Sequence, residues 1–467
     1  MNEDHLARLQ ASVPKAVLGL CQRLTEGGYR AWIVGGCVRD VLLSALLGSD
    51  DVSARNDWDI ATNARPEQTK ALFRRVIPTG IQHGTVTVLI DSVGYEVTTL
   101  RGETTYSDGR RPDSVYFVDD ITDDLARRDF TINAIAYDPL ANRLIDPFHG
   151  TDDLRARLLR AVGEAPARFA EDGLRVLRAA RFVATLDVEL EPATARAIAP
   201  SLDSYRKVSA ERIRDEWLKT TKARRPSRAF EVMREHGLLA ISAPELIESV
   251  GCEQNRHHAF DVWGHALACL DHCPPTPVLR IAGLLHDVGK PRSRAFSDKT
   301  NDYTFYEHER IGAEMAAPLL ERLRFSSDER DRIVALVRHH LICYDAAWTD
   351  AAVRRWIQRV SPELLPELYE LNRADVLGKG RDATPDLERL AELQERVQAV
   401  IAAGAALSVK ELAISGNDLK AELGLPPGPA YGRILRTLLE EVIEHPELNE
   451  RDPLLARARE LAVTSQS

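Results

Sequence analysis

Apolar and polar positions divide the chain into a first part that mixes strands with helices and a longer part that is helical. Short apolar or alternating runs predict strands at residues 29–34, 85–90 and 95–100. Helical spacing of apolar residues predicts helices at residues 14–24 and 38–47. Strand signals stop after Asp153. We therefore expect an α+β fold, with a small mixed sheet and its helices first and a long all-α body after it.

Composition narrows the class of protein. The 467 residues are long enough for several domains, and 44% hydrophobic with 28% charged residues is typical of a soluble globular protein. No signal peptide or membrane-length apolar run is evident, and the six cysteines form no Cys-x-x-Cys pair, so we expect a cytoplasmic protein. The net charge of −10 argues against indiscriminate binding to nucleic acid. Residues 205–234 nevertheless carry ten Lys/Arg against four acids, which suits a phosphate backbone or a solvated helix face equally well.

Two glycines, Gly35 and Gly36, join the first predicted strand to the helix that follows it. Glycines let the backbone approach an anion closely, and the free N–H groups at a helix start point toward it. Arg39 adds a positive fork that fits phosphate. Asp57 and Asp59 are two apart in a predicted strand and would point to one face. Two carboxylates beside a phosphate cradle require compensating cations, most simply Mg²⁺.

Two further segments carry polar groups suited to a nucleotide. Glu96 lies on the strand predicted at residues 95–100 and is the candidate for a third carboxylate beside the two aspartates. Residues 127–133 combine arginines with an aspartate and an asparagine, which offer donors and acceptors for phosphate and ribose hydroxyls together. The candidate nucleotide ligands in this segment are Arg128, Asp129 and Asn133.

A helix predicted at residues 171–181 carries further candidate nucleotide ligands, namely Asp172, Arg175, Arg178 and Arg181. Asp172 and Arg175 are three apart and would be neighbours on one helix face. Cytosine and adenine both offer an amino donor beside an unprotonated ring nitrogen, which an aspartate and an arginine can recognise. Uracil and guanine present the opposite pattern, so both contacts would be repulsive. The alternative interpretation is an ordinary ion pair on a helix surface.

These motifs together resemble those of the class II tRNA nucleotidyltransferases, or CCA-adding enzymes, and their poly(A) polymerase relatives, whose heads are of the DNA polymerase beta type. The resemblance implies that Asp57, Asp59 and Glu96 serve catalysis, that residues 127–133 recognise the ribose and that residues 171–181 choose the base. The stretch between Arg101 and Arg127 resembles a flexible loop that helps these enzymes switch from C to A addition. Residues 79–85 resemble the tRNA-type enzymes rather than poly(A) polymerases. Residues 48–55 are an insert without an assigned role, and His149 replaces a usual hinge glycine.

Histidines and aspartates spaced along residues 257–380 form a second pattern. The candidate metal ligands are, in order, His265, His286, Asp287, His308, His339 and Asp375. The set resembles that of HD-type metal phosphohydrolases, in which imidazole and carboxylate ligands hold a divalent transition metal such as Ni²⁺, Mn²⁺ or Co²⁺. In some bacterial CCA-adding enzymes such a domain hydrolyses phosphate esters, including 2′,3′-cyclic phosphates at tRNA ends. A degenerate, purely structural HD domain is the alternative.

The resulting hypothesis is a CCA-adding enzyme that transfers CMP and AMP from CTP and ATP to the 3′ end of tRNA, with no membrane partner. We expect a catalytic head at residues 1–150, a helical neck that binds base and RNA at 151–250, an HD domain at 251–385 and a helical tRNA-binding domain at 386–467. One alternative is an A-adding enzyme or a poly(A) polymerase. An alternative of another class is an HD phosphohydrolase whose head only binds RNA.

Overall fold

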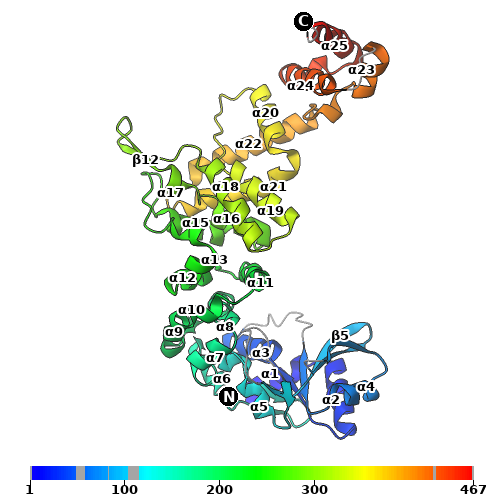
Figure 1. The fold of residues 1–467 in the computed structure, drawn as a ribbon, viewed down its shortest axis with the longest axis vertical. Coiled ribbons are helices and arrows are strands. Elements are labelled where there is room, and N and C mark those ends of the chain that lie inside the picture. Colours follow the sequence, from blue (N-terminus) through cyan, green and yellow to red (C-terminus); the bar gives the residue numbers. More distant parts are fainter. Residues whose placement is uncertain (1–2, 49–57, 82–83, 104–114, 424–427, 465–467) are drawn as a thin grey trace. The chain divides into compact units, whose positions relative to one another are not determined.

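A computed structural model describes residues 3–48, 58–81, 84–103, 115–423 and 428–464. Contacts within it divide the chain into two compact units, Met1–Pro244 and Glu245–Ser467 (Figure 1). The first unit contains a mixed sheet with helices and then a helical neck, and the second is almost wholly helical. The predicted fold class, an α+β head followed by an all-α body with an HD domain, is confirmed.

The head is built on a sheet of seven described strands in the spatial order β3–β4–β5–β2–β1–β8–β9. The strands are β1 Ala31–Val34, β2 Asp59–Thr62, β3 Val76–Gly80, β4 Thr85–Ile90, β5 Val93–Thr99, β8 Ala136–Asp138 and β9 Arg143–Ile145. Strands β2 and β5 are parallel, and the other neighbouring pairs are antiparallel. The three predicted strands correspond to β1, β4 and β5. Every residue of β1 is buried, which explains its continuous apolar run.

Helices pack around this sheet (Figure 1). They are α1 Glu3–Ser12, α2 Lys15–Glu26, α3 Gly36–Leu47, α4 Pro66–Leu72, α5 Ile121–Ala126 and α6 Gly150–Ala156. Helix α3 packs against α1 and α6. The predicted helices at 14–24 and 38–47 correspond to α2 and α3. Asp57, most of the insert before it, and the stretch between β6 (Arg101–Glu103) and β7 (Val115–Phe117) lie outside the described residues.

The neck consists of short helices around α8. They are α7 Ala165–Glu171, α8 Leu174–Thr185, α9 Pro192–Ile198, α10 Leu202–Tyr205, α11 Ala210–Thr220, α12 Ser227–Glu235 and α13 Leu238–Ser242. Helices α11 and α12 both pack on α8. Strands β10 (Leu158–Leu159) and β11 (Glu189–Leu190) pair in parallel here, so short strands occur after Asp153 within the mainly helical body that was predicted. A two-residue strand is too short to produce an alternating pattern.

The second unit contains two groups of helices. The first comprises α15 Val262–His272, α16 Pro277–Leu285, α17 Lys290–Ser293, α18 His308–Arg322, α19 Ser327–His339, α20 Asp350–Val360, α21 Leu365–Gly378 and α22 Thr384–Ala402, with the hairpin β12 Ala295–Ser297 and β13 Asp302–Thr304. The second comprises α23 Gly416–Leu423, α24 Pro429–Glu444 and α25 Arg451–Thr464, which share an apolar core of their own. None of the described helices is long and apolar enough to cross a membrane.

Candidate functional site

The turn before α3 brings together three of the predicted site residues. Gly35 has φ +83°, a backbone conformation that L side chains rarely adopt. A Cβ at this position would lie 3.3 Å from Asp59 Oδ2 and 3.3 Å from Arg128 Nη1. A carboxylate and a guanidinium therefore flank the start of α3, and Gly36 is the first residue of that helix. The free N–H groups of a helix start beside a guanidinium form a site suited to phosphate.

Glu96 is aligned with Asp59 across the sheet. The parallel pair β2–β5 places Ile60 beside Val97 and Ala61 beside Thr98. Continuing this register by one residue brings Asp59 opposite Glu96, on the face shared by Ala61 and Thr98. Asp59 is half-buried and Glu96 is exposed. Two carboxylates on one face form part of the oxygen donor set that Mg²⁺ takes.

A chain of hydrogen bonds connects the first turns of α3 with helix α8. Arg39 Nη1 donates to Asn133 Oδ1 (2.5 Å), and Asn133 Nδ2 donates to Asp129 Oδ1 (2.9 Å). The other oxygen of Asp129 pairs with Arg178 Nη2 at 2.6 Å. Four residues predicted from three separate motifs are thus in direct contact. The segments predicted to bind phosphate, ribose and base are therefore connected by hydrogen bonds.

Phe182 is a residue of this site that sequence analysis missed. The guanidinium carbons of Arg39, Arg178 and Arg181 lie 5.2, 5.3 and 4.1 Å from its ring centre. Such cation–π contacts orient guanidinium groups without using their N–H donors. In the sequence this residue reads as an ordinary apolar position of a helix, so no local signal marks it.

Asp129 remains ionised although it is buried. Burial opposes ionisation, but the charge of Arg178 and the hydrogen bond from Asn133 outweigh it and lower the pKa of Asp129 to about 2. A carboxyl group whose pKa is lower in the folded chain stabilises the fold above its unfolded pKa. That contribution is lost as the pH falls from about 4 toward the folded pKa.

The Asp129→Asn variant is therefore expected to lose about 2 kcal/mol of unfolding free energy at neutral pH. Urea unfolding measured across the acid range checks this value, and the difference from the wild type should shrink as the pH falls below about 4. Asp152→Asn, at an exposed ion pair, is the control and should cost little at any pH. A deficit at Asp129 that stays constant with pH would contradict the explanation.

The predicted helix at residues 171–181 is interrupted. Helix α7 ends at Glu171, and Asp172 is extended, with φ −140° and ψ 108°. Its Oδ1 accepts a hydrogen bond from the backbone N–H of Leu174 at 2.9 Å and so caps the start of α8. A Cβ on Gly173 would lie 2.2 Å from the carbonyl oxygen of Ser204, so the backbone passes directly against α10. The prediction that Asp172 lies on the same helix as Arg175 is therefore wrong.

The two predicted base-reading residues bond to other groups. Asp172 Oδ2 pairs with Arg212 Nη2 at 2.7 Å. Arg175 donates to Glu171 Oε2 (2.6 Å) and to the carbonyl of Arg127 (2.9 Å). Arg212 is a second residue that sequence analysis missed, although it lies in the basic stretch noted at residues 205–234. Its Nη1 is buried and has no hydrogen-bond partner among the described residues.

Arg181 differs from Arg178 in its partner. Its Nε donates to Glu216 Oε2 at 2.5 Å, and Glu216 is buried on α11. Burial lowers the pKa of Arg181, and Glu216 opposes that shift. Arg181 thus connects α8 to α11, whereas Arg178 connects α8 to the ribose segment.

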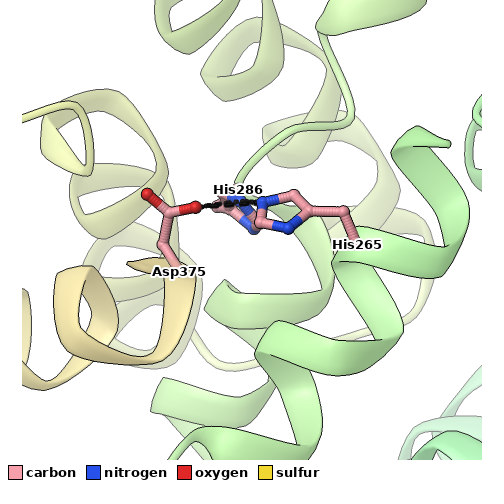
Figure 2. A group of neighbouring side chains, drawn as sticks. All are labelled: His265, His286 and Asp375. Carbon is pink, nitrogen blue, oxygen red and sulfur yellow. Dashed lines mark hydrogen bonds and ion pairs between the residues drawn. The ribbon is translucent and has the colours of Figure 1, made fainter. Parts of the chain in front are cut away.

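In the second unit, His265 on α15, His286 after α16 and Asp375 on α21 point toward one another (Figure 2). His265 Nε2 lies 2.9 Å from Asp375 Oδ1 and 3.1 Å from His286 Nε2. Asp287 Oδ2 lies 3.3 Å from His265 Nε2 and 3.1 Å from His286 Nε2. The four side chains therefore present nitrogen and oxygen atoms to one small space.

A second pair of imidazoles faces the other oxygen of Asp287. His308 Nε2 and His340 Nε2 lie 3.4 and 3.5 Å from Asp287 Oδ1 and 3.3 Å from each other. Their Nδ1 atoms are held by the backbone carbonyls of Phe305 and Val337, which fixes the orientation of both rings. Asp287 therefore stands between two sets of imidazole ligands.

His340, and not the predicted His339, faces this cluster. The buried positions of α19 are Ile333, Leu336 and Val337, and the next position with the same helical spacing is residue 340. His339 lies off this face and is half-buried. The spacing of the apolar residues was the signal that could have separated the two neighbouring histidines.

The buried carboxylates of this cluster require positive charge close to them. Burial opposes protonation of His286, but Asp287 and Asp375 outweigh it and raise the pKa of His286 to about 10. Lys290 Nζ pairs with Asp287 Oδ2 at 2.6 Å. Imidazole and carboxylate donors around buried acids fit divalent transition metals, and two groups of ligand atoms lie close enough together to hold an ion, His265 with His286 and Asp375, and His286 with Asp287 and His340.

Comparisons with known proteins agree with this geometry. Three family models match: the Poly A polymerase head domain at residues 31–160, the probable RNA and SrmB-binding site of polymerase A at residues 187–249, and the HD domain at residues 257–380. The fold and its sites thus define an enzyme, a nucleotidyltransferase with an HD domain.

Proteins of similar sequence and structure identify the family within this class of enzymes. A CCA-adding enzyme from Limosilactobacillus fermentum is 32% identical over 455 residues, which cover 95% of this chain and 96% of that protein. One from Lactobacillus johnsonii is 47% identical over 223 residues, but this match spans 48% of the chain and only about half, 54%, of the relative. The Bacillus stearothermophilus CCA-adding enzyme in complex with CTP matches with a TM-score of 0.70 and 28% identity, covering 100% of this chain and 99% of that one. The chain belongs to the family of CCA-adding enzymes.

Proposed function

We propose that this chain adds CMP and AMP, taken from CTP and ATP, to the 3′ end of tRNA. The observation that carries the proposal is the hydrogen-bonded chain Arg39–Asn133–Asp129–Arg178, which links the phosphate, ribose and base segments. CTP and tRNA appear in the names of solved structures of similar fold, from Bacillus stearothermophilus and Thermotoga maritima. We infer that this enzyme takes the same substrates.

Each part of the head has a role in the proposed transfer step. Gly36 and Arg39 hold the triphosphate, and Arg128 with Asp129 holds the ribose. The tRNA 3′-oxygen forms a bond to the α-phosphorus, the bond from that phosphorus to the bridging oxygen breaks, and pyrophosphate leaves. Mg²⁺ held by Asp57, Asp59 and Glu96 would lower the pKa of the 3′-hydroxyl and neutralise charge on the phosphates. Arg39 adds a fixed cation at the same phosphates.

Base choice is assigned to Asp172 and Arg175. Asp172 accepts a hydrogen bond from the amino group of cytosine or adenine, and Arg175 donates to the adjacent ring nitrogen. Arg212 holds Asp172 Oδ2 and so orients the carboxylate as an acceptor. When the nucleotide binds, Arg175 gives up its hydrogen bond to Glu171 and donates to the base instead.

Changing Asp172 to asparagine is expected to admit UTP, because an amide can donate to the uracil carbonyl where a carboxylate cannot. The ratio of kcat/KM for CTP over UTP should fall by about 10- to 100-fold. Single-turnover incorporation into tRNA that lacks its end measures the ratio. Asp203→Asn, exposed on the nearby α10, should leave it unchanged. An unchanged ratio at Asp172 would exclude this residue from base choice.

We also propose that the HD cluster hydrolyses phosphate esters. The observation that favours this second activity is the convergence of His265, His286, Asp287 and Asp375, with His308 and His340 on the other side of Asp287. A divalent transition metal such as Ni²⁺, Mn²⁺ or Co²⁺ bound there would supply an activated water and a Lewis acid. Lys290 keeps Asp287 ionised as a ligand.

The remaining assignments follow from these two activities. We infer a cytoplasmic enzyme whose head, neck, HD domain and tail follow the predicted boundaries, with one adjustment. The boundary at residue 385 falls inside α22, and Gly404, with φ +70°, is a better end for the HD domain.

One incubation separates the transferase hypotheses. Transfer RNA that lacks its end is offered CTP and ATP, singly and together, and the product is resolved at single-nucleotide length. The expected product is two C residues followed by one A. Addition of A alone would identify an A-adding enzyme, and a long A tail would identify a poly(A) polymerase. No incorporation, with phosphate release, would leave an HD phosphohydrolase with an RNA-binding head.

A further inference from the structure

A cleft of about 120 Å³ lies beside the HD cluster. Two helices line it, each with one stripe at the spacing i, i+3, i+4, i+7. The stripe on α21 is Asn372, Asp375, Val376 and Lys379, and the stripe on α22 is Asp386, Arg389, Leu390 and Leu393. Leu341, Ile342 and Tyr344, which follow His340, complete the lining. Asp375 belongs to both the stripe and the cluster, so the cleft adjoins the candidate metal site at this residue.

The walls of this cleft fit a compact ring. Val376, Leu390 and Leu393 are buried and apolar. Tyr344 is held in place, since its hydroxyl donates to Glu392 Oε1 (2.7 Å) and accepts from Arg396 Nη1 (3.3 Å). A cleft of about 120 Å³ has room for one compact ring, such as a sugar or a small base.

Two cations and two acids line this cleft. Lys379 Nζ and Arg389 Nη1 each lie 3.3 Å from a carboxylate oxygen of Asp386, and Asp375 is the second acid. The side chain of Arg389 is 64% exposed and so can reach an anion outside the cleft. A phosphate adjacent to the bound ring would pair with this guanidinium.

We propose that this cleft holds one ring of the nucleoside of a phosphate ester whose phosphoryl group lies at the HD cluster, and that Lys379 and Arg389 contact the neighbouring phosphate of an RNA chain. The proposal rests on the hydrolytic activity proposed above. In that reaction the water oxygen forms a bond to phosphorus, the bond from phosphorus to the nucleoside oxygen breaks, and that oxygen takes up the proton. Helix α22, which lies beyond the residues matched by the HD family model, would thus select the substrate.

The test uses the full chain with Mn²⁺ and three esters. They are uridine 3′-monophosphate, an RNA oligonucleotide that ends in uridine 3′-monophosphate, and acetyl phosphate, whose organic part is too small to reach the cleft walls. Uridine is chosen because the transferase site is proposed to reject uracil. Leu341→Trp fills the mouth, and Ile401→Trp, exposed farther along α22, is its control. Arg389→Ala removes the exposed cation, and Arg373→Ala, exposed on α21 outside the cleft, is its control.

Leu341→Trp is expected to raise KM for both uridine esters about tenfold and to leave acetyl phosphate hydrolysis unchanged. Arg389→Ala should raise KM for the oligonucleotide and not for the mononucleotide. Equal KM values for Leu341→Trp and Ile401→Trp would overturn the cleft as the nucleoside site, and an equal effect of Arg389→Ala on both esters would overturn the contact with a second phosphate.

If no ester is hydrolysed, acetyl phosphate included, the proposed hydrolytic activity is wrong. Calorimetry then measures directly whether uridine 3′-monophosphate binds to the cleft. Binding that Leu341→Trp weakens supports the nucleoside site, and absence of binding overturns it.

Discussion

Replacement of Asp59 by asparagine is expected to lower the rate of nucleotide incorporation about 10³-fold or more while the head remains folded. Asp59 lies at the start of β2, with its Oδ2 beside the glycine turn and close to Arg128. An amide keeps the shape of the side chain and removes the charge that a divalent cation requires. Rapid-quench incorporation of CMP into tRNA that lacks its end measures the loss, and circular dichroism checks the fold.

Asp91→Asn is the matched control for that experiment. Asp91 is exposed at the turn between β4 and β5 in the same sheet, and its φ of +50° suits asparagine. This variant should incorporate nucleotides at the wild-type rate. If Asp59→Asn also retained that rate, the metal-binding role of the β2 carboxylate would be wrong, and the transferase assignment would lose its catalytic centre.

The second large effect is expected at Asp287. Asp287→Asn should abolish hydrolysis of phosphate esters, by about 10³-fold or more, and should leave nucleotide incorporation intact. Both oxygens of Asp287 face imidazoles, so one substitution weakens both sides of the cluster. Mass spectrometry of bound metal provides a measurement independent of activity, and the metal content should fall together with hydrolysis.

Loss of this carboxylate also leaves Lys290 buried without its ion pair, which costs about 3–5 kcal/mol. His340→Gln is therefore tested in parallel, because it removes a ligand and keeps that pair. Asp345→Asn, at an exposed acid of the same unit, should change neither metal content nor hydrolysis. Wild-type metal content and hydrolysis in both cluster variants would exclude the HD cluster as a metal centre.

Sequence analysis predicted best what is local in the chain. Strand alternation located β4 and β5, and the paired glycines located the turn from β1 into α3, because strand, turn and helix start lie within a few residues. The fold class and the family could therefore be predicted without coordinates. The alignment of Asp59 with Glu96, by contrast, depends on the parallel pairing of β2 with β5, which β3 and β4 separate in the chain.

Contacts between distant residues could not be predicted in the same way. Arg212 reaches Asp172 across 40 residues, and Arg39 reaches Asn133 across 94. Helical spacing treated Asp172 and Arg175 as neighbours, but a capping hydrogen bond to Leu174 removed Asp172 from the helix. A side chain that competes with the backbone for a hydrogen bond changes local structure without changing the apolar pattern.

Gly173 constrains the gene as well as the protein. Any nucleotide change at the first or second position of a glycine codon replaces the glycine, and here a side chain would overlap the carbonyl of Ser204 and displace the backbone beside Asp172. On the role proposed for Asp172, such mutations are expected to alter base recognition although they change no residue that contacts the base. Only the third, silent position of the Gly173 codon can therefore change without replacing the glycine.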